Sequence, residues 1–212
     1  IDTSVPGIPT IASVGDDTGR SATDGVTSDN TVTVKGVAEP GVTVTLYNGA
    51  TALGSAVADA QGNYTIVTSA LADGSYNLSV QASDAAGNTG TGSAAVTVVI
   101  DTVTPVAPAI TGPSGSTNNN TPTITGTAEA NAIVKVYDGA TLIGTVLADA
   151  QGAWSLALTT SLADGSHSIT ATATDVAGNT GPASGATTLT VDSTPPAINF
   201  AAITVDGSFA LG

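Results

Sequence analysis

The sequence contains no cysteine, and it has only three basic residues, Arg20, Lys35 and Lys135, against seventeen acidic ones. Without cysteine, a secreted β-domain cannot use disulfides and must be held together by core packing, bound metal or both. The formal net charge of −14 argues against nucleic acid and anionic membrane surfaces as partners and favours cations as ligands.

Long apolar runs and strong helix formers are also scarce. No apolar run approaches the roughly 18–20 residues of a membrane-spanning helix, and no charged segment followed by an apolar run indicates a signal peptide. Gly, Ala, Ser, Thr, Val and Asp dominate instead, and this composition predicts short strands joined by many turns. The first residues, Ile1-Asp2, repeat a joint sequence found again in mid-chain, so we expect a segment excised from a longer array.

The usual catalytic motifs are missing. The only histidine, His167, aligns with Tyr76 of an internal repeat, which indicates a structural position. There is no cysteine nucleophile, no Gly-x-Ser-x-Gly elbow and no phosphate-binding loop. The chain has enough acidic residues to form the carboxylate pair of a glycoside hydrolase. These residues recur at turns in both repeats, however, which is typical of a structural role. We therefore predict that the protein is not an enzyme.

What the sequence does contain is a repeat: residues 31–100 align almost without gaps with residues 121–191. A period of roughly 90–100 residues indicates tandem globular domains, because solenoid repeats are about 20–50 residues long. We predict one domain over residues 1–100, a second over 101–191, and a joint over 192–212 that starts a further unit or forms a C-terminal tail. In that last stretch, strands are possible at Ile198, Phe200, Ile203 and Val205.

Apolar residues alternate with Thr and Ser inside each repeat. Ile169, Ala171 and Ala173, for example, are separated by threonines, the pattern of a half-buried antiparallel strand. About seven such strands fit each repeat, which predicts an all-β protein of two-sheet sandwiches. Tyr64 and Trp154 occupy equivalent places on the fifth strand, and we expect both to fill the core.

Acidic residues recur at turns and at three joints, residues 1–9, 99–108 and 191–196, where an aspartate precedes Thr or Ser and prolines. If the strands run up and down in order, four acidic side chains of each domain converge on the end where the chain enters. In the first domain these are Asp2, Glu39, Asp59 and Asp84, and in the second Asp101, Glu129, Asp149 and Asp175.

Clustered carboxylates repel one another unless a cation lies among them. Oxygen ligands without His or Cys favour calcium over zinc or copper, so these eight residues are predicted Ca²⁺ ligands. Asp73, at the opposite end of the first domain, is added as a weaker candidate because an Asp-Gly turn explains it equally well. The alternative is that all these acids form turns and provide solubility.

The two repeats differ most between their first and second strands. The first has a long acidic loop over residues 14–30, whereas the second has a short connection over residues 111–120. The sequence leaves three interpretations open: a solvated loop, a cation site, or a brace on the next domain.

Five motifs occur twice in the same order: the Asp-Thr-x-x-Pro joint, the Ala-Glu turn, the Asp-Ala-Gln-Gly turn, the Leu-Ala-Asp-Gly-Ser turn and the Asp-x-Ala-Gly-Asn-Thr-Gly loop. Together they resemble the bacterial immunoglobulin-like repeats of giant biofilm-associated, type I-secreted (RTX) adhesins. The resemblance implies two tandem Ig-like Greek-key β-sandwich domains in an elongated, monomeric array. The implied role is a calcium-rigidified extender on the bacterial cell surface, serving cell adhesion and biofilm formation.

The same resemblance implies partners. These are calcium, neighbouring repeats of the same chain, and a host or matrix surface reached through domains outside this sequence. The alternative function is an adhesive module that binds a glycan or a protein. Such sites usually present exposed aromatic residues and arginine, and this chain has seven aromatic residues and one arginine.

Overall fold

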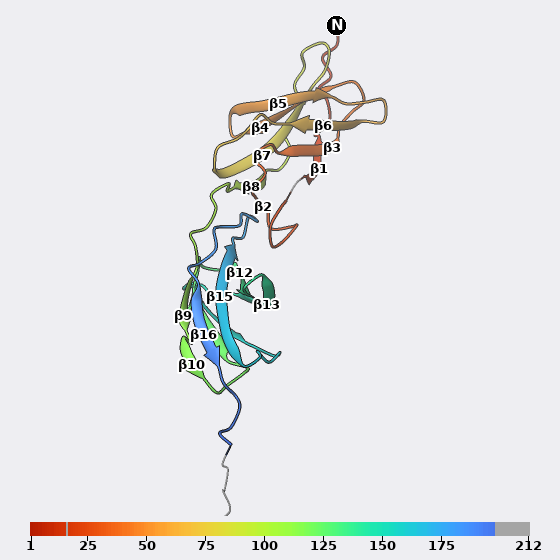
Figure 1. Cartoon of the computed structure of the whole chain (residues 1–212). Helices are drawn as coiled ribbons and strands as arrows, with labels where there is room; N and C mark the ends of the chain where they lie inside the picture. Colours follow the sequence, from red (N-terminus) through yellow and green to blue (C-terminus); the bar gives the residue numbers. More distant parts are fainter. Residues whose placement is uncertain (16, 198–212) are drawn as a thin grey trace, which may run out of the picture.

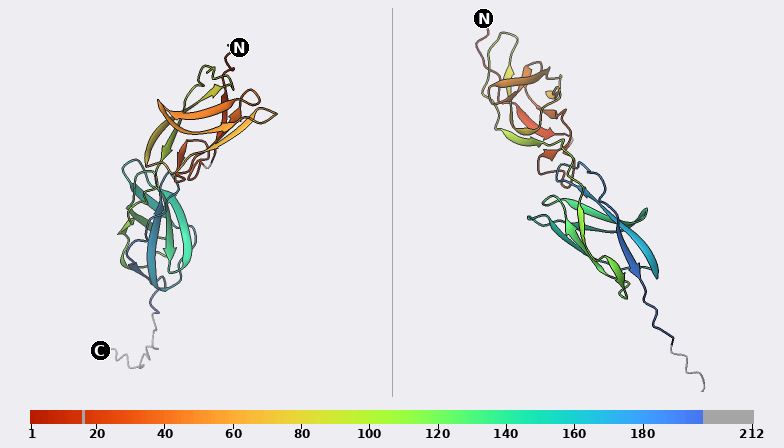
Figure 2. Two further views of the ribbon diagram at one scale, coloured as in Figure 1. Left: turned by 90° about the horizontal axis from the view of Figure 1, so that it is seen from above. Right: turned by 60° about the vertical axis from the view of Figure 1, so that its left-hand side comes forward.

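The computed structural model describes residues 1–15 and 17–197, and within them every regular element is a strand. Figures 1 and 2 show two β-sandwiches end to end, with the N-terminus at the far end of the first and the chain leaving from the far end of the second. This confirms the all-β prediction of two Ig-like domains in an elongated array. The predicted strand residues Ile198, Phe200, Ile203 and Val205 lie outside the described residues.

The first domain has eight strands in two sheets, of order β1-β3-β6 and β2-β8-β7-β4-β5. Their bounds are β1 Thr10–Val14, β2 Val26–Thr27, β3 Thr33–Val37, β4 Thr43–Asn48, β5 Thr51–Val57, β6 Asn63–Val67, β7 Gly74–Ser83 and β8 Val96–Ile100. All pairs are antiparallel except β2 with β8, which is parallel.

The second domain repeats this topology, with sheets of order β9-β11-β14 and β10-β16-β15-β12-β13. Its strands are β9 Ala109–Gly112, β10 Gly115–Thr117, β11 Thr123–Thr127, β12 Ile133–Asp138, β13 Thr141–Leu147, β14 Ala153–Ala157, β15 Gly165–Thr174 and β16 Thr187–Val191. The count exceeds the expected seven because the chain, after its first strand, crosses to the other sheet and pairs in parallel with the last strand.

Each core follows the predicted alternation and centres on one aromatic side chain. Tyr64 is 3% exposed and Trp154 4% exposed, which confirms both as core residues. Each lies opposite a glycine on the neighbouring strand, Gly36 beside Tyr64 and Gly126 beside Trp154. A Cβ atom at either glycine would overlap the aromatic side chain. Only glycine at these two positions leaves room for the aromatic side chain to pack over the neighbouring strand. Burial also raises the pKa of Tyr64 to about 12.

Where the chain enters a domain is called its leading end, and where it leaves, its trailing end. The trailing end of the first domain faces the leading end of the second (Figure 1). Among the residues that the structure describes, no helix is long and apolar enough to cross a membrane.

Candidate functional site at the joint between the domains

The chain that connects the domains is held from both sides at consecutive residues. From the first domain, Asp73 Oδ1 accepts hydrogen bonds from the Thr102 backbone N–H at 3.0 Å and from its hydroxyl at 2.9 Å. From the second domain, Asn179 Nδ2 donates to the carbonyl oxygen of Asp101 at 2.8 Å. Because the two anchors are adjacent in sequence, the linker has no free residue at which to bend between them.

The rest of the linker lies against the second domain. Pro105 and Pro108 are buried, and the proline ring fixes φ at each of them. The carbonyl of Pro105 lies so close to Gly181 that a Cβ atom there would overlap it. The linker is therefore part of the second domain's packed surface and not a flexible tether.

One of the two anchors recurs at each of the other joints. At the first, Asn88 Nδ2 donates to the carbonyl of Asp2 at 3.1 Å. At the last, Asp164 Oδ1 accepts from the Ser193 N–H at 2.9 Å and from its hydroxyl at 2.6 Å. The hydroxyls of Ser193 and then Thr194 lower the pKa of Asp164 to about 2. The repetition indicates that the joint geometry is encoded in each repeat.

Two predicted metal ligands, Asp84 and Asp175, organise the loops that carry these asparagines. Asp175 is 3% exposed, and its Oδ1 accepts from the N–H groups of Gly178 at 2.7 Å and Asn179 at 2.9 Å. Asp84 Oδ1 likewise accepts from the Asn88 N–H at 2.8 Å. The side-chain amide of Asn88 is the main cause of the lowered pKa of Asp84.

Asp59 and Asp149 are both engaged in their own turns. Asp59 Oδ1 accepts from the N–H groups of Gln61 at 2.9 Å and Asn63 at 2.8 Å, and the backbone bond from Asn63 is the largest cause of its lowered pKa. Asp149 Oδ1 makes the equivalent bonds in the second domain. These are local Asx-type turns, in which the carboxylate satisfies backbone donors two and four residues on.

The remaining predicted ligands of the first domain and the linker also have backbone partners. Glu39 Oε1 accepts from the Gly7 N–H at 2.8 Å, Asp2 Oδ1 from the Ser4 N–H at 2.9 Å, and Asp101 Oδ1 from the Val103 N–H at 3.0 Å. Within residues 1–15 and 17–197, no group of three or more acidic or histidine side chains is arranged to hold a metal ion. Calcium binding by these residues stays a prediction.

At the joint, the surroundings of Glu129 disfavour its charged form. Desolvation by its surroundings, followed by the negative charges of Asp175 and Asp101, raises its pKa. The structure therefore brings three of the four predicted ligands of the second domain within electrostatic reach, while Asp149 serves its turn. A nearby cation would relieve this repulsion.

The long acidic loop of the first domain reaches the second domain, so of the three interpretations the structure shows the brace. Thr18 Oγ1 donates to the carbonyl of Ala177 at 2.7 Å, and the Arg20 N–H donates to the carbonyl of Val176 at 3.2 Å. Arg20 Nη1 also reaches the carbonyl of Asn131 at 3.5 Å. The contact places one of the chain's three basic residues at the acidic leading end of the second domain.

The loop is also fixed on its own domain. The Ser28 N–H donates to Thr18 Oγ1 at 2.8 Å, and Asp17 Oδ2 accepts from the Gly25 N–H at 3.1 Å. Gly19 packs against Gly178 so closely that a Cβ atom on Gly178 would lie 2.9 Å from the Gly19 backbone. The brace is thus a direct backbone contact between the domains.

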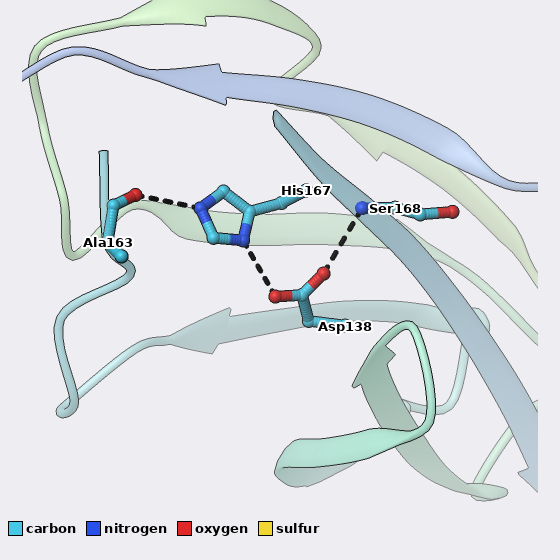
Figure 3. Close-up of polar contacts among 4 residues, drawn as sticks. All are labelled: Asp138, Ala163, His167 and Ser168. Atoms are coloured by element: carbon cyan, nitrogen blue, oxygen red, sulfur yellow. Dashed lines mark hydrogen bonds and ion pairs between the residues drawn. The ribbon is translucent and has the colours of Figure 1, made fainter. Parts of the chain in front are cut away.

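His167, the only histidine, lies near the trailing end of the second domain, where β15 begins opposite the end of β16. Figure 3 shows its polar contacts. Its Nδ1 lies 2.7 Å from Asp138 Oδ2, and its Nε2 lies 2.8 Å from the carbonyl oxygen of Ala163. Tyr76 makes the equivalent bond in the first domain, donating to the carbonyl of Ala72 at 2.8 Å. Both neighbours of His167 are acceptors, so both ring nitrogens hold hydrogen bonds only when the imidazole is doubly protonated.

We expect the second domain to lose stability as the pH rises above neutrality. The bond to Ala163 and then that to Asp138 raise the pKa of His167 above 6.5, so its contribution is complete below pH 6.5 and is lost as the pH passes the folded-state pKa. Trp154 is the only tryptophan, and its fluorescence reports melting of this domain from pH 6 to 9. His167→Tyr should flatten the profile; a wild-type profile that is already flat would contradict the assignment.

The joint anchors were not identified from the sequence. Asn88 and Asn179 lie in a repeated loop, in which the sequence predicts Asn179 only as an additional calcium ligand. Asp73 is predicted only as a turn former or a ligand. One feature of the sequence could have revealed them: the repeated loop occurs together with an Asp-Thr or Asp-Ser joint in both copies. Two motifs that repeat together are candidates for contact in the folded chain.

Comparison with known proteins places both repeats in one family. The family described as "Bacterial Ig-like domain" matches residues 4–102 and 107–193. A search of curated proteins finds no match.

Similar solved structures include the fibronectin(III)-like modules of Clostridium thermocellum CbhA, at 21% identity and a TM-score of 0.48, covering 78% of this chain and 87% of that one. A biofilm-associated protein BSP domain matches at 20% identity and a TM-score of 0.36, covering 90% of this chain and 30% of that one. A tetra-tandem repeat from the extending region of a large adhesion protein matches at 21% identity and a TM-score of 0.37, covering 88% and 49%. The chain thus spans less than half the length of each of these last two structures.

Proposed function

The chain belongs to the bacterial Ig-like domain family, and from that premise we propose that it is an extender segment of a large bacterial cell-surface adhesin. In this role it is a non-catalytic, extracellular spacer that holds a binding region away from the cell and serves cell adhesion and biofilm formation. The observation that carries the proposal is the linker held at Asp101 and Thr102 by Asn179 and Asp73.

An extender must transmit position along its length, and the joint has the properties that this requires. Consecutive linker residues are hydrogen-bonded to different domains, the linker prolines are buried, and the Thr18 brace adds a contact away from the linker. Three separate points of attachment resist bending in more directions than a single hinge does. The alternative adhesive module is not favoured, because among the described aromatic residues Trp154 and Tyr64 are buried in the cores. The other three, Tyr47, Tyr76 and Tyr137, are half-buried.

Calcium is proposed as an additional stabiliser of the joint. Asp101, Glu129 and Asp175 supply only oxygen ligands, the kind that calcium prefers. The pKa of Glu129 is raised by desolvation first and then by the negative charges of Asp175 and Asp101. The carboxylates of Asp101 and Glu129 would have to turn toward a shared ion. Extracellular modules bind calcium with Kd values of about 10⁻⁴ to 10⁻³ M.

The proposal is tested by melting the full chain and recording its small-angle X-ray scattering in 10 mM calcium and in chelator. At these affinities, one bound ion should stabilise the joint-facing domain by about 1.4–2.7 kcal/mol, and the scattering should report an elongated particle in calcium. Glu129→Gln should remove the calcium-dependent change at the joint. Glu39→Gln removes the same charge at the far end of the first domain and should leave that change intact.

Two results would count against the proposal in different ways. Equal melting temperatures in calcium and chelator would remove calcium from the account but leave the extender function standing. A compact scattering profile in both conditions would contradict the extender function itself.

A further inference from the structure

We propose that the brace and its target are a reusable pair, in which residues 17–20 act as a locking segment and the turn over residues 84–88 of the first domain is a second receptor for such a segment. The occupant of that receptor would be a β-sandwich domain placed ahead of the first, with its own long loop between its first two strands. The inference rests on the proposed extender function and assigns differences in stiffness between joints to the loop of the preceding domain.

The contact between the domains depends on the backbone conformation of the second domain and not on the identity of its side chains. The locking segment donates from the Thr18 hydroxyl and the Arg20 N–H, and the acceptors on the second domain are the carbonyls of Ala177 and Val176. Close approach is possible because Gly19 meets Gly178. Any turn with the same backbone path and a glycine at the same place would therefore offer the same acceptors.

The turn over residues 84–88 has this backbone path. The Asp84 N–H donates to the carbonyl of Asn88 at 3.0 Å, and Asp175 with Asn179 makes the same bond at 3.0 Å. Gly87 has φ of 88°, matching 99° at Gly178.

The residue whose carbonyl Arg20 contacts, Asn131, also has a conformational counterpart in the first domain. Asn131 has φ of 63° and is the only non-glycine residue with positive φ among those described, and its counterpart Gly41 has φ of 80°. The second domain thus adopts at Asn131 a conformation that glycine takes at Gly41, so the carbonyl reached by Arg20 has an equivalent on the first domain.

The two turns differ in what covers them. Ala177 is 0% exposed beneath the locking segment, whereas residues 85–87 are all exposed. A Cβ atom on Gly87 would meet nothing within 4 Å, while one on Gly178 would meet Gly19. The first domain therefore presents an uncovered copy of a surface that is covered on the second.

Only a domain with the long loop can supply the locking segment. In the second domain, β9 and β10 are joined by a short connection, with β9 ending at Gly112 and β10 beginning at Gly115. In the first, β1 ends at Val14 and β2 begins at Val26. A domain with the short connection should be followed by a more flexible joint. In an array, the stiffness of each joint would then depend on the loop length of the domain before it.

The test is a three-domain chain in which residues 1–100 precede residues 2–191, so that Ile100 is followed by Asp2 and the joint sequence is preserved. A matched control places residues 101–191 ahead of residues 2–191. Because the sequence has no cysteine, Ala50→Cys in the original first domain and Ala50→Cys or Ala140→Cys in the added domain give unique spin labels. Pulsed EPR in chelator then measures the spread of distances across the new joint without any calcium effect.

Across the joint behind the long-loop domain, we expect a distance distribution as narrow as that across the native joint. Across the joint behind the short-loop domain, we expect the distribution to be at least twice as broad. Gly87→Ala in the receptor should broaden the first case, while the same substitution in the two-domain chain leaves the native joint unchanged. Equal widths behind long-loop and short-loop domains, or no effect of Gly87→Ala, would overturn the receptor assignment. A native joint that is itself broad in both calcium and chelator would instead overturn the proposed extender function.

Discussion

Alanine at Gly126 should lower the melting temperature of the second domain by about 12–24 °C. A Cβ atom there would overlap both the carbonyl oxygen of Ala109 and the indole ring of Trp154. Neither can retreat easily, since one is backbone of the paired strand β9 and the other is 4% exposed in the core. Overpacking of this severity costs about 3 kcal/mol, which corresponds to that temperature shift in a domain of this size.

The measurement is Trp154 fluorescence during thermal unfolding, with Gly185→Ala as the control. A Cβ atom on Gly185 would meet nothing within 4 Å, so that variant should differ from wild type by less than about 0.5 kcal/mol. Gly36→Ala, which faces Tyr64 and the carbonyl of Thr10, should destabilise the first domain in the same way. A Gly126→Ala protein that melts like the control would show that the ring does not lie across the glycine.

Alanine at Gly178 should loosen the joint while leaving both domains folded. Its Cβ atom would lie 2.9 Å from the Cα and N atoms of Gly19, so the locking segment must withdraw and the Thr18 and Arg20 bonds to this turn are lost. We expect the distance distribution between labels on the two domains to broaden at least twofold in chelator.

Gly87→Ala is the matched control for this variant. Gly87 and Gly178 both have positive φ, so alanine strains the two turns alike, but only Gly178 touches the other domain. The strain should lower the melting temperature of each affected domain by a similar amount, while only Gly178→Ala changes the interdomain distances. If both variants broadened the distribution equally, the effect would come from turn strain and the brace would have no mechanical role.

The fold was predictable because the pattern that specifies it is local. Alternating residues such as Ile169, Ala171 and Ala173 lie on one face of a strand by geometry, and their burial follows from it. The equivalence of Tyr64 and Trp154 predicted the two core centres for the same reason. The extra strands β2 and β10 were missed because two or three residues in parallel pairing leave no periodic signal.

The roles of the acidic residues were harder to predict because one residue type serves two purposes at a turn. Asp149 accepts hydrogen bonds from the backbone of its own turn, whereas desolvation and then nearby negative charges raise the pKa of Glu129. Nothing in the sequence separates these two cases. The brace joins Thr18 to Ala177 across 159 positions, a distance at which no local pattern operates. Only the end-to-end placement of the domains brings these residues together.

The most direct test of the account is the distance between the two domains of the otherwise unaltered chain. Ala50→Cys and Ala140→Cys place one label on an exposed turn of each domain, and pulsed EPR in 10 mM calcium gives the full distribution of separations. A stiff spacer predicts a single narrow peak. A broad distribution that extends to short, folded-back separations in calcium would contradict it.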